Sequence, residues 1–330
     1  MKEEIKNKYP PDSAGRRMTE KVPVFLAEDK ISTIREILIK RAGEFKTLNY
    51  IYVVDEGGKL RGVLSIKEVF QKPGESMLKD LMVKEIIKVK PHTDQERVAI
   101  LALQHNLKSI PVVNKDDKFL GIVSSNTILD ILHSEHVEDF LKLAGIHGPL
   151  AKTLRGSAIF LAKIRTPWLI LGLFGGILAA QIVNFFETPL KTHFILAAFI
   201  PLIVYMADAV GTQTETLFIR NLVLDSQFGI RKYLFREIRV SFLIALVLGI
   251  LLSFLSIFCF GSPYFIGLIL GISLFFTVLS AILIGIFIPF LFQKLKKDPA
   301  IGSGPFGTIL RDVVSLLIYF SLASIMLKLF

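Results

Sequence analysis

The sequence has few of the residues that build disulfides and soft-metal sites. Its single cysteine, Cys259, lies in an apolar run and can form no disulfide within the chain. Its histidines are scattered rather than grouped, at His92, His105, His133, His136, His147 and His193. Because soft metals select thiolate and imidazole ligands, these absences disfavour a soft-metal site in the apolar half. That half also lacks a Ser/His pair, a catalytic Asp pair and a metalloprotease motif, so we do not expect an enzyme.

The first residues, MKEEIKNKYPPDSAGRRM, also lack the apolar core of a signal peptide, so the N-terminal half is expected to stay in the cytoplasm. The formal net charge is +10. In the second half of the chain the basic residues gather at the ends of apolar runs: Lys163, Arg165, Arg220, Arg231, Lys232, Arg236, Arg239, Lys294, Lys296 and Lys297. Membrane topology explains this distribution better than nucleic-acid binding, and we expect no nucleic-acid partner.

Long apolar runs are abundant after about Arg165. The chain is 52% hydrophobic with a mean hydropathy of +0.55. We expect a membrane domain over 165–330 with five helical spans, at 168–186, 194–219, 238–260, 264–292 and 307–329. The basic loops then place the N-terminus in the cytoplasm and the C-terminus outside the cell. The sequence thus predicts a multi-pass protein of the plasma membrane, in contact with its lipid.

The polar half contains an internal repeat. IYVVDEGGKLRGVLSIKEVF, from Ile51, matches IPVVNKDDKFLGIVSSNTIL, from Ile110. Each copy predicts a strand, a tight turn, a second strand and a helix. An amphipathic segment precedes each copy, at Ser32–Arg41 and Asp94–Asn106. A duplication of this size predicts two similar subdomains that pack together.

This repeat resembles a tandem pair of CBS domains. The resemblance covers 19–134, divided into 19–78 and 79–134, after a short polar tail at 1–18 and before a connecting, plug-type helix at 135–164. Many such pairs bind adenine nucleotides, with an acid that contacts the ribose in a Gly-x-x-Ser/Thr-x-x-Asp pattern. The matching residues are Ser65 and Glu68 in one copy and Ser124 and Thr127 in the other. Since only one copy keeps a carboxylate, both a nucleotide site and a regulatory module without nucleotide stay open.

Three carboxylates lie within the predicted spans rather than at their ends. Asp208 lies roughly 20 Å into the second span, Glu215 follows two helical turns later, and Asp312 lies roughly 10 Å into the last span. A carboxylate at such a depth costs on the order of 3 kcal/mol, so it indicates a functional site by default. Asp208, Thr212 and Glu215 share one helix face. Carboxylate and hydroxyl oxygens are ligands that hard cations such as Mg²⁺ and Ca²⁺ prefer.

Structural explanations for these carboxylates are also open. Asp208 could form a buried ion pair with a basic residue of another span, and threonine or glutamine side chains could satisfy Asp208 and Glu215 in a packed core. Arg311 is the obvious partner for Asp312, but adjacent residues of a helix point about 100° apart and do not face each other.

Three stretches of the second half resemble the MgtE family of magnesium channels: RTPWLILGLFGGILAA (165–180), PLIVYMADAVGTQTET (201–216) and KKDPAIGSGPFGTILRDVVSLLIYFSLA (296–323). The resemblance implies a homodimer with its ion path along the twofold axis. It implies that Asp312 binds hydrated Mg²⁺, and that Gly211, Thr212 and Gln213 belong to the path. It also implies that the CBS pair and the connecting helix sense Mg²⁺, with Glu135, Glu138 and Asp139 as candidate regulatory residues and Asp94 and Glu96 as weaker ones.

The chain departs from the family pattern in two respects. We expect a short form, because only about 20 residues of the sequence precede the repeat, whereas the family usually has an acidic helical domain there. In the second span, Asp208 and Glu215 stand within a stretch that the family usually fills with other residues. We therefore predict a multi-domain protein, a cytosolic α/β CBS pair followed by an all-α membrane domain, that transports divalent cations, Mg²⁺ first. The alternatives are an exchanger coupled to Na⁺ or H⁺ and, less favoured, a membrane-anchored CBS sensor without transport.

Overall fold

The computed structural model describes residues 8–146, 156–187, 191, 193–224, 229–295 and 297–329. The chain forms two compact units, Met1–His136 and Val137–Phe330. Strands occur in the first unit, whereas the described part of the second unit is helical. The predicted division into an α/β part and an all-α part is therefore confirmed.

The first copy of the repeat is built around a three-stranded sheet with the order β1-β2-β3. Its elements are β1 (Val24–Leu26), α3 (Ile31–Arg41), η1 (Ala42–Glu44), β2 (Tyr50–Val54), β3 (Leu60–Ser65), α4 (Ile66–Gln71) and α5 (Leu78–Leu81). The predicted hairpin and its flanking helices are present. Strand β1, which pairs in parallel with β2, was not predicted. It is too short to show a period-two pattern.

The second copy contains α6 (Gln95–Gln104), β4 (Ser109–Val113), β5 (Phe119–Ser124) and α7 (Ser125–Leu143). The segment predicted as a polar tail contributes to this copy, because α2 (Ala14–Arg17) brings Ala14 and Met18 into its core beside Val98 and Ile110. Residues 1–7 of that tail lie outside the described part of the chain. The predicted connecting segment, 135–164, holds the end of α7 and the start of the next helix, and its residues 147–155 are not described.

The two hairpins repeat one another down to their irregularities. The strand register shifts between Val53 and Val54 in one copy and between Val112 and Val113, the matching pair of the repeat, in the other. Bulges of this kind recur at equivalent positions because they set the local twist of a hairpin. The repeat found in the sequence is therefore a repeat of backbone geometry as well.

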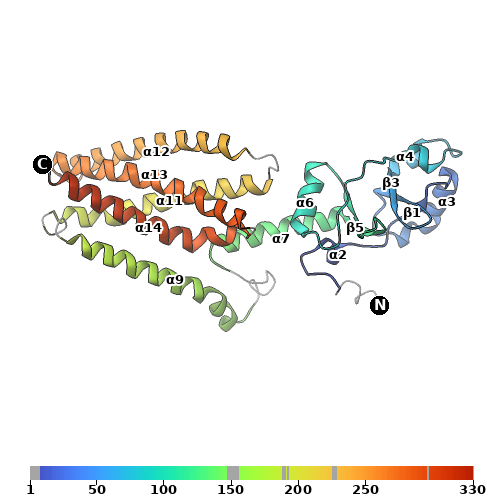
Figure 1. Cartoon of the computed structure of the whole chain (residues 1–330), viewed down its shortest axis with the longest axis horizontal. Helices are drawn as coiled ribbons and strands as arrows, with labels where there is room; N and C mark the ends of the chain where they lie inside the picture. The colour runs from blue at the N-terminus through green and yellow to red at the C-terminus, as the bar shows by residue number, and fades with distance from the viewer. Residues whose placement is uncertain are drawn as a thin grey trace. The chain divides into compact units, whose positions relative to one another are not determined.

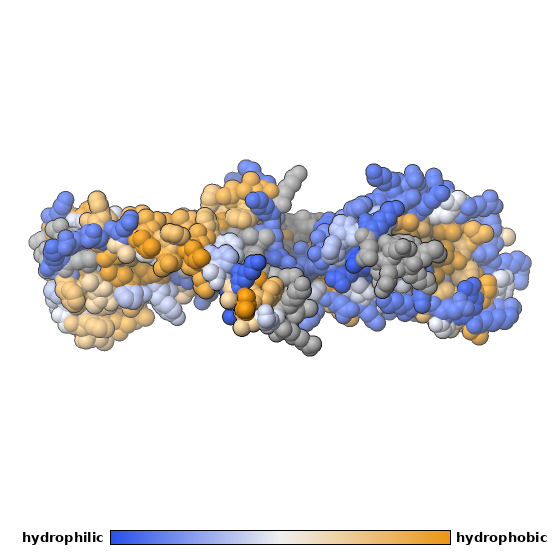
Figure 2. Space-filling view, turned by 90° about the horizontal axis from the view of Figure 1, so that it is seen from below, coloured by the Kyte–Doolittle hydropathy of each residue, from blue (hydrophilic) through white to orange (hydrophobic). Residues whose placement is uncertain are grey.

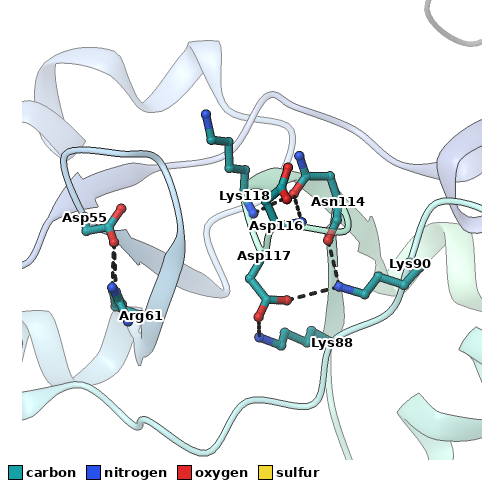
Figure 3. Close-up of polar contacts among 8 residues, drawn as sticks. All are labelled: Asp55, Arg61, Lys88, Lys90, Asn114, Asp116, Asp117 and Lys118. Atoms are coloured by element: carbon teal, nitrogen blue, oxygen red, sulfur yellow. Dashed lines mark hydrogen bonds and ion pairs between the residues drawn. The ribbon is translucent and has the colours of Figure 1, made fainter.

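The turns of the hairpins use the same hydrogen bonds. The side chains of Asp55 and Asn114 accept hydrogen bonds at 2.8 Å from the backbone amides of Lys59 and Lys118, respectively. Figure 3 shows Asp55 and Asn114 at their turns. Gly58 and Asp117 occupy equivalent positions and both adopt a positive φ, of 78° and 62°. Aspartate is one of the few non-glycine residues that tolerate this conformation.

Ion pairs surround these turns without fixing them. Asp55 pairs with Arg61 at 2.8 Å, and Asp117 pairs with Lys88 and Lys90 at 3.1 Å (Figure 3). Because these side chains are open to water, which screens their charges, each pair adds little to stability. The hydrogen bonds from backbone amides to the Asp55 and Asn114 side chains, rather than the ion pairs, stabilise the two turns.

The second unit contains five helices that are long and apolar enough to span a membrane, among the described residues. They are α9 (Ala158–Phe185), α11 (Ile195–Leu224), α12 (Ile230–Phe258), α13 (Tyr264–Lys294) and α14 (Pro299–Met326) (Figure 1). Five helices of spanning length occur where the spans were predicted, although α9, α12 and α14 begin earlier than predicted, at Ala158, Ile230 and Pro299. Hydrophobic residues cover much of the visible face of these helices, whereas hydrophilic residues dominate that of the first unit (Figure 2).

Helix α13 is the central helix of the bundle and packs against α11, α12 and α14 (Figure 1). It lies so close to α12 that a side chain at Gly249 of α12 would be 2.7 Å from the carbonyl oxygen of Gly271 of α13. Small residues at such crossings are typical of helices packed within membranes. Helix α9 packs mainly on α14 and has no buried residue among its described positions.

Candidate functional site

The polar centre of the membrane unit is built around Arg311 of α14. Its guanidinium donates to Oδ1 of Asp208 at 2.9 Å and to Oε2 of Glu215 at 2.7 Å, both on α11. The side chains of Arg311 and Glu215 are 1% and 3% exposed, while that of Asp208 is 33% exposed. Of the interpretations that the sequence left open for Asp208, the structure contains the ion pair with a basic residue of another span.

Hydroxyl groups complete the surroundings of the guanidinium. Nη2 of Arg311 donates to Oγ1 of Thr212 at 3.1 Å and to Oγ1 of Thr308 at 3.3 Å. All three guanidinium nitrogens thus have partners. A buried charge is tolerated only when it is paired and hydrogen-bonded in this way. We call Asp208, Glu215 and Arg311 the charge triad.

Glycines from three helices make room for the charge triad. A side chain at Gly211 of α11 would collide with the aliphatic part of Arg311 and would lie 3.1 Å from the carbonyl oxygen of Ala281. At Gly285 of α13 it would lie 2.7 Å from the carbonyl oxygen of Gly211. At Gly307 of α14 it would lie 3.2 Å from Oε1 of Glu215. The helices therefore approach closely around the Glu215–Arg311 pair, and both side chains are almost fully buried although they border the larger of the two cavities described below.

Among the described residues Arg311 forms its ion pairs with Asp208 and Glu215 rather than with its neighbour Asp312, in agreement with the helix geometry. Asp312 lines two cavities. One cavity of about 610 Å³ contains residues from the first half of α9, the second half of α11 and the start of α14. The other, of about 460 Å³, is lined by the second half of α9, the first half of α11 and later residues of α14. Both cavities include Asp208, Thr308 and Asp312. These three residues therefore lie where two cavities at different depths of the bundle meet.

The other residues predicted for an ion path have different positions. Thr212 lines the larger cavity, while Gln213 is exposed and lines neither of the two cavities. Gly211 is a packing position. No three histidine, cysteine or carboxylate side chains converge on a metal-sized site in the described residues. The roles of Asp312, Asp208, Glu215, Thr212, Gln213 and Gly211 toward a cation stay predictions.

A further buried carboxylate, Glu237 of α12, was not predicted from the sequence. It is 6% exposed and accepts a hydrogen bond at 3.2 Å from Thr214, the neighbour of Glu215. The basic residues around it suggested a loop, and the third span was predicted to begin just after it. The helical periodicity continues back to Ile230, which would have placed Glu237 inside the span.

The end of α7 is held against the start of α14 by charged groups. Nζ of Lys142 lies 2.8 Å from Oε1 of Glu138 and 2.6 Å from Oδ2 of Asp298. Burial, reinforced by the carboxylate of Asp298, raises the pKa of Asp139 to about 6. Two of the predicted regulatory residues, Glu138 and Asp139, thus belong to one charged cluster with Lys142 and Asp298.

Backbone contacts fix the same junction. Helix α14 is kinked at Gly304, where ψ is −113°, and the carbonyl oxygen of Leu143 occupies the space that a side chain at Gly304 would need. Gly145 adopts a φ of 72° and lies against Pro305. Leu143 also lines the larger cavity. The end of α7 therefore forms part of the wall of the cavity that holds Asp312.

The remaining regulatory candidates lie in the first unit and have structural partners. Gln95 donates to Oε1 of Glu135 at 2.5 Å. Asp94 caps α6 by accepting from the amide of Glu96 at 2.8 Å. Their proposed sensing of cations stays a prediction.

The predicted nucleotide residues make local contacts in both copies. Ser65 and Glu68 form a capping box at the start of α4. In the second copy, Ser124 and Thr127 lie 3.0 Å apart through their hydroxyl oxygens. The contact of the Glu68 carboxylate with the amide of Ser65 is long, at 3.4 Å. Nucleotide binding stays a prediction.

Comparison with known proteins identifies the group to which the chain is related. The family model described as "Divalent cation transporter" (MgtE) matches residues 200–322, and the CBS domain model matches 14–74 and 78–134. The chain is 36% identical to the magnesium transporter MgtE of Bacillus subtilis, over 96% of this chain and 70% of that protein. The chain belongs to the MgtE family. It is also 35% identical to the Thermus thermophilus MgtE, over 97% of this chain and 71% of that one.

Among solved structures, the CBS unit is similar to the cytosolic domain of the Mg²⁺ channel MgtE in complex with ATP. The identity is 31% over 39% of this chain and 52% of that chain, with a TM-score of 0.38. The family assignment makes the chain a multi-pass membrane protein of a divalent-cation transporter family, as the sequence predicted. Both of these relatives are named as transporters rather than as enzymes.

Proposed function

We propose that the chain carries Mg²⁺ across the plasma membrane along the two cavities that meet at Asp312. The position of Asp312 carries this proposal, because its carboxylate is shared by a cavity on each side of it along the bundle. An intramembrane carboxylate that lines a cavity is costly, and it is expected where an ion must pass.

The chemistry of the site suits a hydrated divalent cation. Mg²⁺ loses its water reluctantly and binds through one or two carboxylates rather than a cage of protein ligands. Asp312 supplies one carboxylate, and the partly exposed Asp208 and the hydroxyl of Thr308 lie beside it on both cavities. Glu215 is held by Arg311 and supports the site from within the bundle.

We further propose a homodimer in which the CBS pair controls the path through α7. Helix α9 lacks buried residues among its described positions and leaves large apolar side chains uncovered, which favours a second copy or lipid against it. The end of α7 lines the larger cavity, so a shift of the Lys142–Asp298 contact would change the cavity that Asp312 faces. The N-terminal unit lies in the cytoplasm and the C-terminus outside in this arrangement.

No observation favours an exchanger over a channel. Asp208 and Glu215 motivated that alternative as carriers of a second ion, but both carboxylates are paired with Arg311. A sensor without transport would leave the carboxylate between two cavities without a purpose.

Mg²⁺ flux into proteoliposomes tests the proposal. Asp312→Asn keeps the size of the side chain but removes its charge, and we expect flux to fall at least tenfold. Glu187→Gln is the matched control, because this exposed carboxylate lies beyond the end of α9 and pairs only with Lys191 among the ion pairs of the structure's described residues. Unchanged flux in Asp312→Asn would reject the assignment of the path.

A further inference from the structure

The charge triad places a permanent positive charge next to the proposed path. Arg311 is buried, its guanidinium contacts Asp208 and Glu215, and it lines the same cavity as Asp312. A guanidinium stays protonated under all physiological conditions. The formal charge of the three carboxylates and Arg311 is therefore −2, rather than the −3 that the carboxylates alone would give.

The structure is adapted to hold this charge in one position. The guanidinium has four side-chain partners, Asp208, Glu215, Thr212 and Thr308. Gly211 has no side chain, and the space that a side chain there would need is occupied by Arg311. A side chain held by four hydrogen bonds and close packing cannot swing away like an exposed arginine, so its charge acts as a fixed element of the site.

We propose that Arg311 is a specificity-determining residue of the ion path: its fixed positive charge weakens cation binding and does so more for divalent than for monovalent ions. The inference rests on the proposed function. The energy between two charges is proportional to their product, so a fixed +1 opposes a divalent ion twice as strongly as a monovalent one. Conduction requires that an ion bind well enough to enter and weakly enough to leave. Three bare carboxylates would hold Mg²⁺ too long, and Arg311 prevents this.

The central test replaces Arg311 by methionine, which has a similar unbranched shape without charge. In Arg311→Met the half-saturating Mg²⁺ concentration should fall at least tenfold, and the maximal flux should fall because release slows. The inhibition constant of Na⁺ against Mg²⁺ flux should fall by a smaller factor, about the square root of the factor for Mg²⁺, since the energy scales with the charge of the ion. A purely structural role would not produce this squared relation.

Two further variants separate charge from shape. Arg311→Lys keeps the positive charge, so its half-saturating Mg²⁺ concentration should stay within about threefold of wild type. The double variant Glu215→Gln with Arg311→Met has the wild-type net charge of −2 without a guanidinium, and it should also stay near wild type. If Arg311→Met does not fold, Glu215→Gln is compared with the same double variant. These two proteins differ only in the charge of Arg311, and the half-saturating Mg²⁺ concentration should be tenfold lower in the double variant.

Equilibrium binding provides a readout that does not depend on transport. The Mg²⁺ concentration that raises the melting temperature of each variant in detergent should follow the same order as the flux constants. The inference would be overturned, with the proposed function intact, by either of two results. One is an equal half-saturating Mg²⁺ concentration in Arg311→Met and wild type; the other is an equal change in apparent affinity for Mg²⁺ and for Na⁺. Wild-type protein that binds Mg²⁺ but carries none would overturn the proposed function, with the binding series still deciding the role of Arg311. Wild-type protein that neither binds nor carries Mg²⁺ would overturn both.

Discussion

Removal of the Arg311 guanidinium alone should destabilise the membrane unit strongly. In Arg311→Met, the Glu215 carboxylate, which is 3% exposed in the wild type, would lose its partner at 2.7 Å, and Asp208 would lose its partner at 2.9 Å. Two unit charges about 4 Å apart interact by about 4 kcal/mol at an effective dielectric constant of about 20. Breaking a buried pair by removing one partner costs about 3–5 kcal/mol, because the other charge stays buried without compensation.

Neutralising the whole charge triad should have a much smaller effect. The triple variant Asp208→Asn, Glu215→Gln and Arg311→Met keeps the side-chain volumes close to the original and leaves none of the three groups charged. Replacement of a buried ion pair by well-packed neutral groups is often nearly neutral in stability. We expect the triple variant to stay within about 2 kcal/mol of wild type, despite carrying the same Arg311 substitution.

Thermal unfolding in detergent measures both effects. At about 2–4 °C per kcal/mol for a unit of this size, Arg311→Met should lower the apparent melting temperature by roughly 10 °C. Arg239→Met, at an exposed position on α12, is the matched control and should change it little. An Arg311→Met protein that melts with wild type, or a triple variant that melts as low as Arg311→Met, would refute the view that uncompensated buried charge determines stability here.

Three other substitutions test separate features. Gly211→Ala would force its new methyl group into Arg311 and should cost about 1–3 kcal/mol, seen as a lower melting temperature. The pKa of Asp139 in the folded protein, about 6, lies above its ordinary value of 3.8, so protonation as the pH falls from 7 to 5 should stabilise the contacts at the end of α7. Backbone hydrogen exchange over 137–145 should then slow by more than the intrinsic effect of pH, and Asp139→Asn should remove this additional slowing. Tyr52→Phe would remove the 2.6 Å hydrogen bond between the Tyr52 and Ser109 hydroxyls, which joins the two CBS copies. It should lower the free energy of unfolding of the CBS unit by about 1 kcal/mol in denaturant titration. An unchanged free energy would show that this hydrogen bond makes no net contribution.

The repeat and the spans could be predicted because their signals are local. The two hairpins carry the same turn chemistry at the matching positions Asp55 and Asn114, and each apolar run is long enough to define a helix without its neighbours. Strand β1 was missed because so short a strand shows no periodicity. The early start of α12 was missed because a run of basic residues masked the helical pattern around Glu237.

The charge triad could be listed from the sequence but not assembled. Arg311 and Glu215 lie far apart along the chain, and nothing in the residues between them specifies which helix faces α11. The spacing on one helix did predict that Arg311 and Asp312 point in different directions. Which of the two residues pairs with the carboxylates of α11, and which lines both cavities, depends on helix packing, which a single sequence does not determine.

The meeting of the two cavities at Asp208, Thr308 and Asp312 has an electrical consequence. If both cavities admit water, the membrane voltage falls mainly across the thin layer of side chains between them rather than across the full thickness of the bilayer. A divalent ion that passes this layer would then cross almost the whole field in one step, which is worth about 4.6 kcal/mol at about 100 mV. The rate of uptake should therefore respond to membrane potential nearly as steeply as two elementary charges allow, so the resting voltage of the cell would itself act as a driving force concentrated on Asp312.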